Sequence, residues 1–174
     1  MQNRSLKYTF LLFVILAGCS SDFESKKWAN TMKDGQSVII IKNLIDLRLA
    51  ENRGMIFGIQ NGSMHQGSKT MLIIFRILIL IALLIYIWIC REKPVSFLFP
   101  FLMICSGAWG NLLDQFLYGY VVDFIHIGFK GILDWPFYFN LADAYVTIGV
   151  ILIFITNSFR KQPLSNNVTQ LKAQ

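Results

Sequence analysis

The stretch Met71–Cys90, MLIIFRILILIALLIYIWIC, decides the fold of this chain. It carries one charged residue, Arg76, in an otherwise apolar run. A helix needs about 20 apolar residues to cross about 30 Å of hydrocarbon. A helix is also the expected form, because lipid offers no partner to open backbone N–H and C=O groups. The stretch therefore predicts a membrane-spanning helix.

Three further apolar runs accompany it: Tyr8–Ser21, which is shorter, Val95–Leu113 and Leu141–Phe159. The 174-residue chain is 55% hydrophobic and only 15% charged, whereas soluble chains carry about 25% charged residues. Its mean hydropathy is +0.52. The length allows one domain. We therefore expect a membrane protein, mainly α, in a single domain over residues 1–174, with four transmembrane helices at about 8–21, 71–90, 95–113 and 141–159.

Basic residues in short segments predict the orientation. They lie before the first run, between the second and third runs, and after the last: Arg4, Lys7, Arg91, Lys93, Arg160, Lys161 and Lys172. Because basic residues favour the cytoplasmic side, both termini are expected in the cytoplasm. The polar tail at about 162–174 is expected to be disordered. The net charge of +6 does not indicate a nucleic-acid partner, because the basic residues are dispersed and form no binding motif.

The connection at about residues 22–70 would lie outside the membrane. Ile45–Asn52 alternates apolar and polar residues, which is typical of a half-buried strand. Ser37–Ile41 is a shorter β-rich run before it. We therefore expect a small extracytoplasmic β-sheet.

Three acidic residues lie in or beside apolar sequence. Asp114 follows the third run, Asp123 lies in Tyr120–Phe124, and Asp143 begins the fourth run. Ionisable groups at such depth are costly and indicate function by default. Water-facing positions at the ends of the spans are the alternative, which carries most weight for Asp114. Two neighbouring carboxylates share one proton near neutral pH, so Asp123 and Asp143 would suit aspartyl protease chemistry.

The sequence gives less support to a metal site, a cofactor or another catalytic motif. The cysteines Cys19, Cys90 and Cys105 form no CxxC or Cys/His cluster, so no metal site is expected. No cofactor is expected either. His126 could tune the carboxylate site or have a structural role, and the sequence leaves both open. The chain has no HExxH, GxSxG or P-loop motif.

Five motifs carry a resemblance to a known family. In order they are Asp22-Phe23-Glu24-Ser25-Lys26, Asn52-x-Gly54-x-x-Phe57, Gly110-Asn111-x-x-Asp114, Gly119-x-Val121-Val122-Asp123-Phe124 and Trp135-Pro136-x-x-Phe139-Asn140-x-Ala142-Asp143. At these positions, and from about residue 8 to 159, the chain resembles lipoprotein signal peptidase (signal peptidase II), a four-span bacterial membrane aspartyl peptidase.

The resemblance implies an activity and a set of roles. Asp123 and Asp143 would be the catalytic dyad. Gly54 would allow close approach of the substrate. Polar supports for the substrate or the dyad would be Asn52, Asn111, Asp114 and Asn140. The substrate would be a prolipoprotein whose cysteine carries a diacylglyceryl group, cut just before that cysteine at the outer face of the bacterial inner membrane. Membrane lipid is the other expected partner, and an amphipathic segment beside the sheet would help cover the site.

Two positions depart from the family pattern. Gln115 stands where the family usually has Arg, and Ala144 stands where it usually has Ser. Glutamine cannot make the bidentate charged contacts of arginine. A supporting salt link or lipid contact is therefore in question, but the dyad is not.

Leu16-Ala17-Gly18-Cys19 supports a competing hypothesis. Read as a lipobox after an apolar run, it predicts a lipid-anchored protein that is cut before Cys19 and loses its first span. Read as part of that span, it is a chance match, which we favour because the Asp22–Lys26 motif follows at once. A proton-coupled transporter is the other alternative. Internal repeats or broken helices in matched halves would favour it, and the sequence shows neither.

Overall fold

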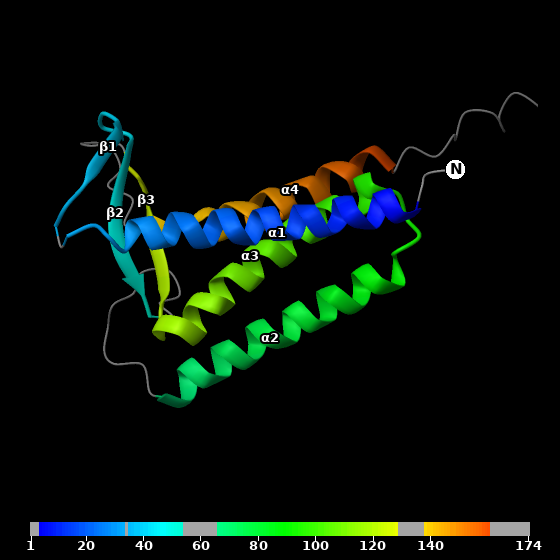
Figure 1. Ribbon diagram of the computed structural model, residues 1–174, viewed down its shortest axis with the longest axis horizontal. Coiled ribbons are helices and arrows are strands. Elements are labelled where there is room, and N and C mark those ends of the chain that lie inside the picture. Colours follow the sequence, from blue (N-terminus) through cyan, green and yellow to red (C-terminus); the bar gives the residue numbers. More distant parts are fainter. Residues whose placement is uncertain (1–3, 34, 54–65, 129–137, 161–174) are drawn as a thin grey trace, which may run out of the picture.

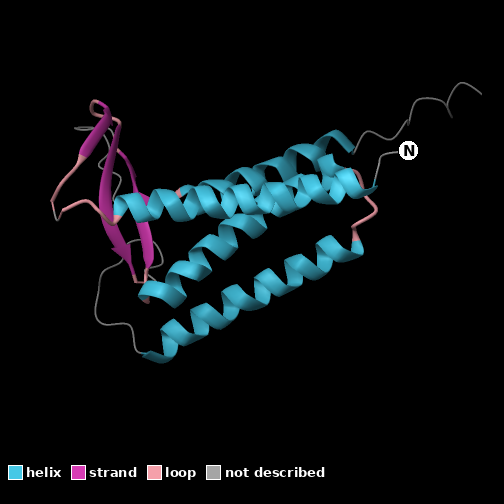
Figure 2. Ribbon diagram, in the orientation of Figure 1, coloured by secondary structure: helices cyan, strands magenta, loops and turns pink. Residues whose placement is uncertain are grey.

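The computed structural model describes residues 4–33, 35–53, 66–128 and 138–160. Within these ranges it has four helices and a four-stranded antiparallel sheet at one end of them (Figures 1 and 2). The helices are α1 (Arg4–Ala29), α2 (Gln66–Ile89), α3 (Val95–Tyr118) and α4 (Leu141–Arg160). The strands are β1 (Val38–Ile41), β2 (Ile45–Asn52), β3 (Val121–Ile127) and β4 (Tyr138–Phe139). The predicted mainly helical fold with a small sheet is thereby confirmed.

Helix α3 is the centre of the helical part, since it contacts α1, α2 and α4. Small residues on α3 let it approach α4 and α1 closely. A side chain at Gly107 would run into the backbone oxygen of Ala142, and one at Gly110 would run into the carboxylate of Asp22. Such small residues are common where membrane helices pack, because they let the backbones come together.

The sheet has the order β1-β2-β3-β4. Strand β3 is central and pairs with β2 on one side and β4 on the other. Its residues Val122 and Phe124 pack against Ala29, at the end of α1. This contact fixes the sheet to the helices, and β3 leads from the end of α3 toward the start of α4.

The helix and strand bounds correct several sequence predictions. Helix α1 runs to Ala29 rather than ending near residue 21, so the outer β region does not begin at 22. The reason is that Asp22 and Lys26 form an ion pair one turn apart and are both buried. Asp114 lies inside α3, which continues to Tyr118, and not after it. Strand β2 has the predicted bounds, whereas β3 and β4 were not predicted.

The lengths and compositions of the helices support the prediction of four membrane spans only in part. By length and composition, α1 and α3 could cross a membrane. The apolar parts of the other two helices within the described ranges, Ile73–Ile89 and Leu141–Thr156, are shorter. The predicted disordered tail lies outside the described residues. Between β2 and α2 only Arg53 is described, so the amphipathic segment is not tested there.

Candidate active site

Asp123 and Asp143 reach one site from two different elements. Asp123 lies in the middle of β3 and is 2% exposed. Asp143 lies in the first turn of α4 and is partly buried. Strand β3 runs beside β4, and α4 begins directly after β4. This connection brings the two carboxylates together although they are 20 positions apart in the sequence.

Asn140 joins the two carboxylates. Its side-chain Nδ2 donates to Asp123 Oδ1 at 2.7 Å. Its Oδ1 accepts a hydrogen bond from the Asp143 backbone N–H at 2.9 Å, and Asp143 Oδ2 accepts one from the Asn140 backbone N–H at 3.3 Å. This reciprocal pattern is a capping box at the start of α4. The residue that begins the helix therefore also fixes the position of the strand carboxylate.

Two further amides donate to the pair. Asn52 lies on β2, two positions beyond the direct partner of Asp123, and its Nδ2 donates to Asp123 Oδ2 at 3.0 Å. Asn111 lies on α3, and its Nδ2 donates to Asp143 Oδ1 at 2.7 Å. Each carboxylate oxygen of the pair thus accepts a hydrogen bond. Gly54, the other substrate-binding residue expected from the sequence, lies outside the described residues.

The electrostatic settings of the two carboxylates differ. Burial, followed by the nearby charge of Asp143, raises the pKa of Asp123 from 3.8 to about 7. Asp143 lies at the N-terminus of α4, where the helix dipole favours a negative charge. The pair can therefore hold one proton near neutral pH.

A buried ionic cluster lies directly behind the site. Lys26 Nζ is 2.7 Å from Asp22 Oδ2 and 2.9 Å from Asp114 Oδ2, and all three side chains are at most 2% exposed. It also donates to Asn111 Oδ1 at 3.0 Å. Asp114 thus contacts Lys26, which donates to Asn111, the amide that donates to Asp143. The sequence motif Asp22–Lys26 gave the signal for this cluster, but sequence reasoning assigned no role to Lys26.

The remaining positions singled out by sequence lie off the site. Gln115 donates through Nε2 to the Gly119 backbone oxygen at 2.8 Å, at the end of α3. His126 Nδ1 is 2.8 Å from Asp46 Oδ1, and its ring stacks on Tyr138. Within the described ranges, no group of three or more His, Cys, Asp or Glu side chains is placed to hold a metal ion.

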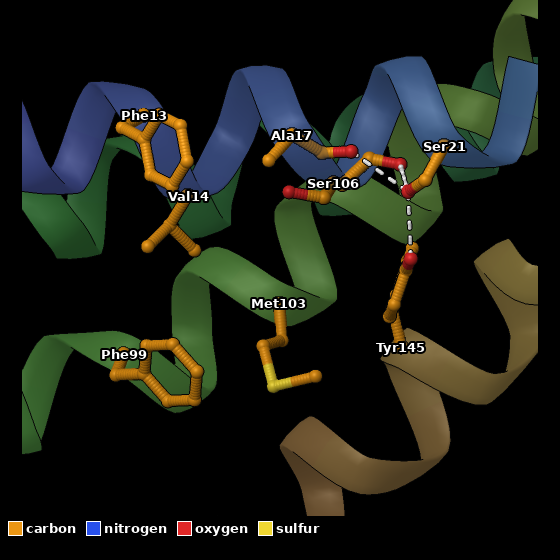
Figure 3. A pocket seen from close by; sticks show the side chains of 9 residues that line it. Phe13, Val14, Ala17, Ser21, Phe99, Met103, Ser106 and Tyr145 are labelled. Carbon is orange, nitrogen blue, oxygen red and sulfur yellow. Dashed lines mark hydrogen bonds between the residues drawn. The ribbon is translucent and has the colours of Figure 1, made fainter.

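An apolar groove of about 370 Å³ lies between α1, α3 and α4 (Figure 3). At one end Ser21 Oγ and Tyr145 Oη are hydrogen-bonded at 2.7 Å. Tyr145 follows Asp143 by two positions, which places the two side chains on opposite faces of α4. The groove is therefore separate from the carboxylate pair.

Comparisons with known proteins agree on one family. The family model described as "Signal peptidase (SPase) II" matches residues 13–159. The chain is 35% identical over 154 residues to a "Lipoprotein signal peptidase" of Pelodictyon phaeoclathratiforme, covering 84% of this chain and 88% of that protein. It is 36% identical over 145 residues to one of Clostridium novyi, covering 83% and 94%.

Two solved structures share the fold, and each is described as a bacterial membrane enzyme. One has a TM-score of 0.74 at 31% identity and covers 91% of this chain and 93% of that one. The other has a TM-score of 0.64 at 31% identity, with coverage of 94% and 95%.

Proposed function

The chain belongs to the signal peptidase II family of aspartic-type membrane peptidases, and from this premise we propose how it acts. It is an intramembrane endopeptidase that removes the signal peptide from diacylglyceryl-modified bacterial prolipoproteins, cutting just before the lipidated cysteine. Asp123 and Asp143 are its catalytic dyad.

The Asn140 bridge is the observation that carries this proposal. One side chain contacts both carboxylates, donating to Asp123 and accepting from the backbone of Asp143. An aspartyl peptidase needs two carboxyl groups that share a proton. The raised pKa of Asp123 near Asp143 supports such sharing. Because the two groups titrate as a pair, the shared proton belongs to the dyad as a whole.

The chemistry follows from this charge distribution. Ionised Asp143 takes a proton from a water molecule, and the resulting hydroxide attacks the scissile carbonyl carbon. Protonated Asp123 donates its proton to the carbonyl oxygen. The tetrahedral intermediate then collapses as Asp143 gives the proton taken from water to the leaving nitrogen and Asp123 takes a proton back from a hydroxyl of the intermediate. The C–N bond breaks, leaving a carboxylate on the signal peptide and an amine on the cysteine, with no covalent enzyme intermediate.

Asn52, Asn111 and Asn140 support this dyad by holding its carboxylate oxygens. Asp114 supports it from behind, since its carboxylate accepts a hydrogen bond from the Val122 backbone N–H, next to Asp123. Gly54 is proposed to let the substrate chain come close. No metal or cofactor takes part in the proposed reaction.

The arrangement of the helices supports a bacterial inner-membrane location with four spans and both termini in the cytoplasm. The sheet lies at one end of the helices, and the start of α1, the α2–α3 turn and the end of α4 lie at the other (Figure 1). Large apolar side chains are exposed along all four helices, including Phe13, Ile85, Phe116 and Phe154. Such surfaces suit lipid contact. The site would then lie near the outer face.

The test is cleavage of a diacylglyceryl-modified prolipoprotein by the purified enzyme in detergent, followed as a gel shift. Wild type should cleave it, whereas Asp123→Asn and Asp143→Asn should be folded and inactive. Asp46→Asn is the matched control, because it neutralises a carboxylate on the same sheet that pairs with His126. Cleavage that survives either dyad change would refute the aspartyl mechanism.

Failure of folded wild type to cleave would favour the other two hypotheses. A lipid-anchored protein would then carry lipid on Cys19. A proton-coupled transporter would move its solute in vesicles in response to a pH gradient.

A further inference from the structure

Lys26 has three N–H groups and three acceptors. Its ammonium contacts Asp22 Oδ2, Asp114 Oδ2 and Asn111 Oδ1 at 2.7, 2.9 and 3.0 Å. A lysine side chain has three donors and no acceptor. The ammonium therefore forms ion pairs with two carboxylates and donates a hydrogen bond to Asn111, inside a site where the lysine side chain is 2% exposed.

The two carboxylates connect Lys26 to both elements that carry the dyad. Asp22 Oδ1 accepts a hydrogen bond from the Ala142 backbone N–H at 2.8 Å, one residue before Asp143. Asp114 Oδ2 accepts one from the Val122 backbone N–H at 3.0 Å, one residue before Asp123. A single ammonium thus joins the start of α4 to strand β3.

The third contact reaches the dyad through an amide. Asn111 presents its oxygen to Lys26 and its nitrogen to Asp143. If this amide turned over, its oxygen would face the carboxylate of Asp143, and the two acceptors would repel. Lys26 can only donate, so it opposes that rotation.

Asn140 alone cannot hold the amide in place. Its Nδ2 also donates to Asn111 Oδ1 at 3.0 Å, but the same nitrogen lies 2.7 Å from Asp123 Oδ1 and 3.2 Å from the Val122 oxygen. Two N–H groups thus serve three acceptors, and the carboxylate is the nearest. Lys26 supplies the donor that is dedicated to Asn111.

We propose that Lys26 is a positioning residue of the peptidase: it fixes the orientation of the Asn111 amide and thereby holds the Asp143 carboxylate in its hydrogen-bonded position. This inference rests on the proposed function, because it assigns Asp143 as the base. It differs from a purely structural role for the ionic cluster, in which Lys26 would only join α1 to its neighbours.

The chain offers a matched control for that structural role. Lys7 is a second buried lysine on α1, and its Nζ donates to the Arg91 and Lys93 backbone oxygens at 2.5 and 2.8 Å. These contacts hold the α2–α3 turn at the other end of the molecule. Lys7→Met should therefore lower the stability and leave the turnover of folded enzyme unchanged.

The experiment measures kcat and KM across pH for wild type, Lys26→Met, Lys26→Arg and Lys7→Met, each normalised to folded enzyme. We expect Lys26→Met to lower kcat by ~10- to 100-fold, as loss of an outer support of a functional side chain does.

The pH optimum of Lys26→Met should rise by about one unit, because a positive charge favours nearby carboxylates in their charged form. The acidic groups around Lys26 are Asp22 on α1, Asp114 on α3, Asp123 on β3 and Asp143 on α4. Lys26→Arg should keep the wild-type pH optimum.

A double variant covers the case in which Lys26→Met does not fold. Lys26→Met combined with Asp22→Asn keeps the net charge of the cluster, and the new amide oxygen can still accept from Ala142 N–H. It removes the donor to Asn111. The inference requires this variant to lose at least ~10-fold in kcat.

Two results would overturn the inference. One is a folded Lys26→Met with the turnover and pH optimum of Lys7→Met. The other is a double variant that cleaves at the wild-type rate. Neither is confused with failure of the proposed function, which would appear as absent cleavage by wild type.

Discussion

Asn140 and Asp143 hydrogen-bond each other in both directions, at 2.9 Å through the asparagine side chain and at 3.3 Å through the aspartate side chain. The same asparagine amide donates to Asp123 at 2.7 Å. The residue that caps α4 therefore also sets the position of one carboxyl of the proposed dyad relative to the other. The cap of α4 and the relative position of the two carboxyls thus both depend on the Asn140 side chain. Different substitutions at Asn140 can test these two roles separately.

Asn140→Ala should lose both stability and activity. It removes the cap of α4, which costs about 1 kcal/mol, and it removes the amide that holds Asp123. Asn140→Ser should keep most of the stability, because serine is a good cap, but its hydroxyl oxygen does not replace the amide. Thermal unfolding in detergent and the cleavage assay measure the two effects. Wild-type activity in Asn140→Ser would show that the amide bridge is dispensable.

Asp123 should make the stability of the protein depend on pH. Its pKa is raised from 3.8 to about 7 by burial and by Asp143. The folded state therefore favours the protonated form, and this stabilisation is present below about pH 4 and is lost as the pH rises through about 7. Asp123→Asn cannot ionise, so it should gain stability over wild type between pH 5 and pH 8, by on the order of a few kcal/mol.

Unfolding of both proteins at pH 5 and pH 8 measures this change. A hydrogen bond lost in the variant contributes equally at both values and cancels. A stability difference that stays constant between the two pH values would mean that Asp123 is already ionised in the folded protein at pH 5.

The same carboxyl should limit activity at alkaline pH. In its proposed role as general acid, Asp123 must be protonated when substrate binds, so kcat/KM of wild type should fall as the pH rises through about 7. The profile of kcat/KM from pH 5 to 9 measures this fall. A flat profile up to pH 9 would remove Asp123 from the role of proton donor.

The sequence predicts the presence of the helices well, because a long apolar run can adopt few structures other than a helix. It predicts β2 because Ile45–Asn52 alternates polar and apolar residues at the surface. Strand β3 was missed because Val121–Phe124 is buried throughout, so no alternation shows. The end of α1 was missed because its last turns carry charged residues whose partners, such as Asp114, lie far along the chain. An ion pair between residues so far apart in the sequence can be recognised only in the folded structure.

Asp123 and Asp143 were predicted from their apolar sequence surroundings and from motifs, whereas the asparagines were predicted from motifs alone. Nothing near Asn52 in sequence shows that it faces Asp123, since the contact follows from the β2–β3 register. Lys26 was part of a motif as well, yet its connection to Asn111 depends on the packing of α1 against α3.

Gly107→Ala should destabilise the protein although alanine is the better helix former. The added Cβ would meet the backbone oxygen of Ala142 and lie 2.9 Å from Val146 Cγ2. Helix propensity favours alanine by about 1 kcal/mol, but overpacking against a backbone costs about 1–3 kcal/mol. Because α4 carries Asp143, its displacement should also lower kcat. A rise in the melting temperature, as propensity alone predicts, would contradict this close approach.

Cys19 should remain an ordinary helical residue joined to the segment before it. Helix α1 is continuous from Arg4 to Ala29, and the Cys19 thiol lies 3.9 Å from the Ser106 oxygen. Lys7 holds the α2–α3 turn on one side of this cysteine, and Lys26 holds the ionic cluster on the other. A cut before Cys19 would release Lys7 from the turn that it binds. Peptide mapping should therefore recover Cys19 with a free thiol in a peptide that spans Leu16–Cys19, and Cys19→Ala should cleave substrate at the wild-type rate. A chain that begins at a lipidated Cys19 would show instead that the enzyme is also processed as one of its own substrates.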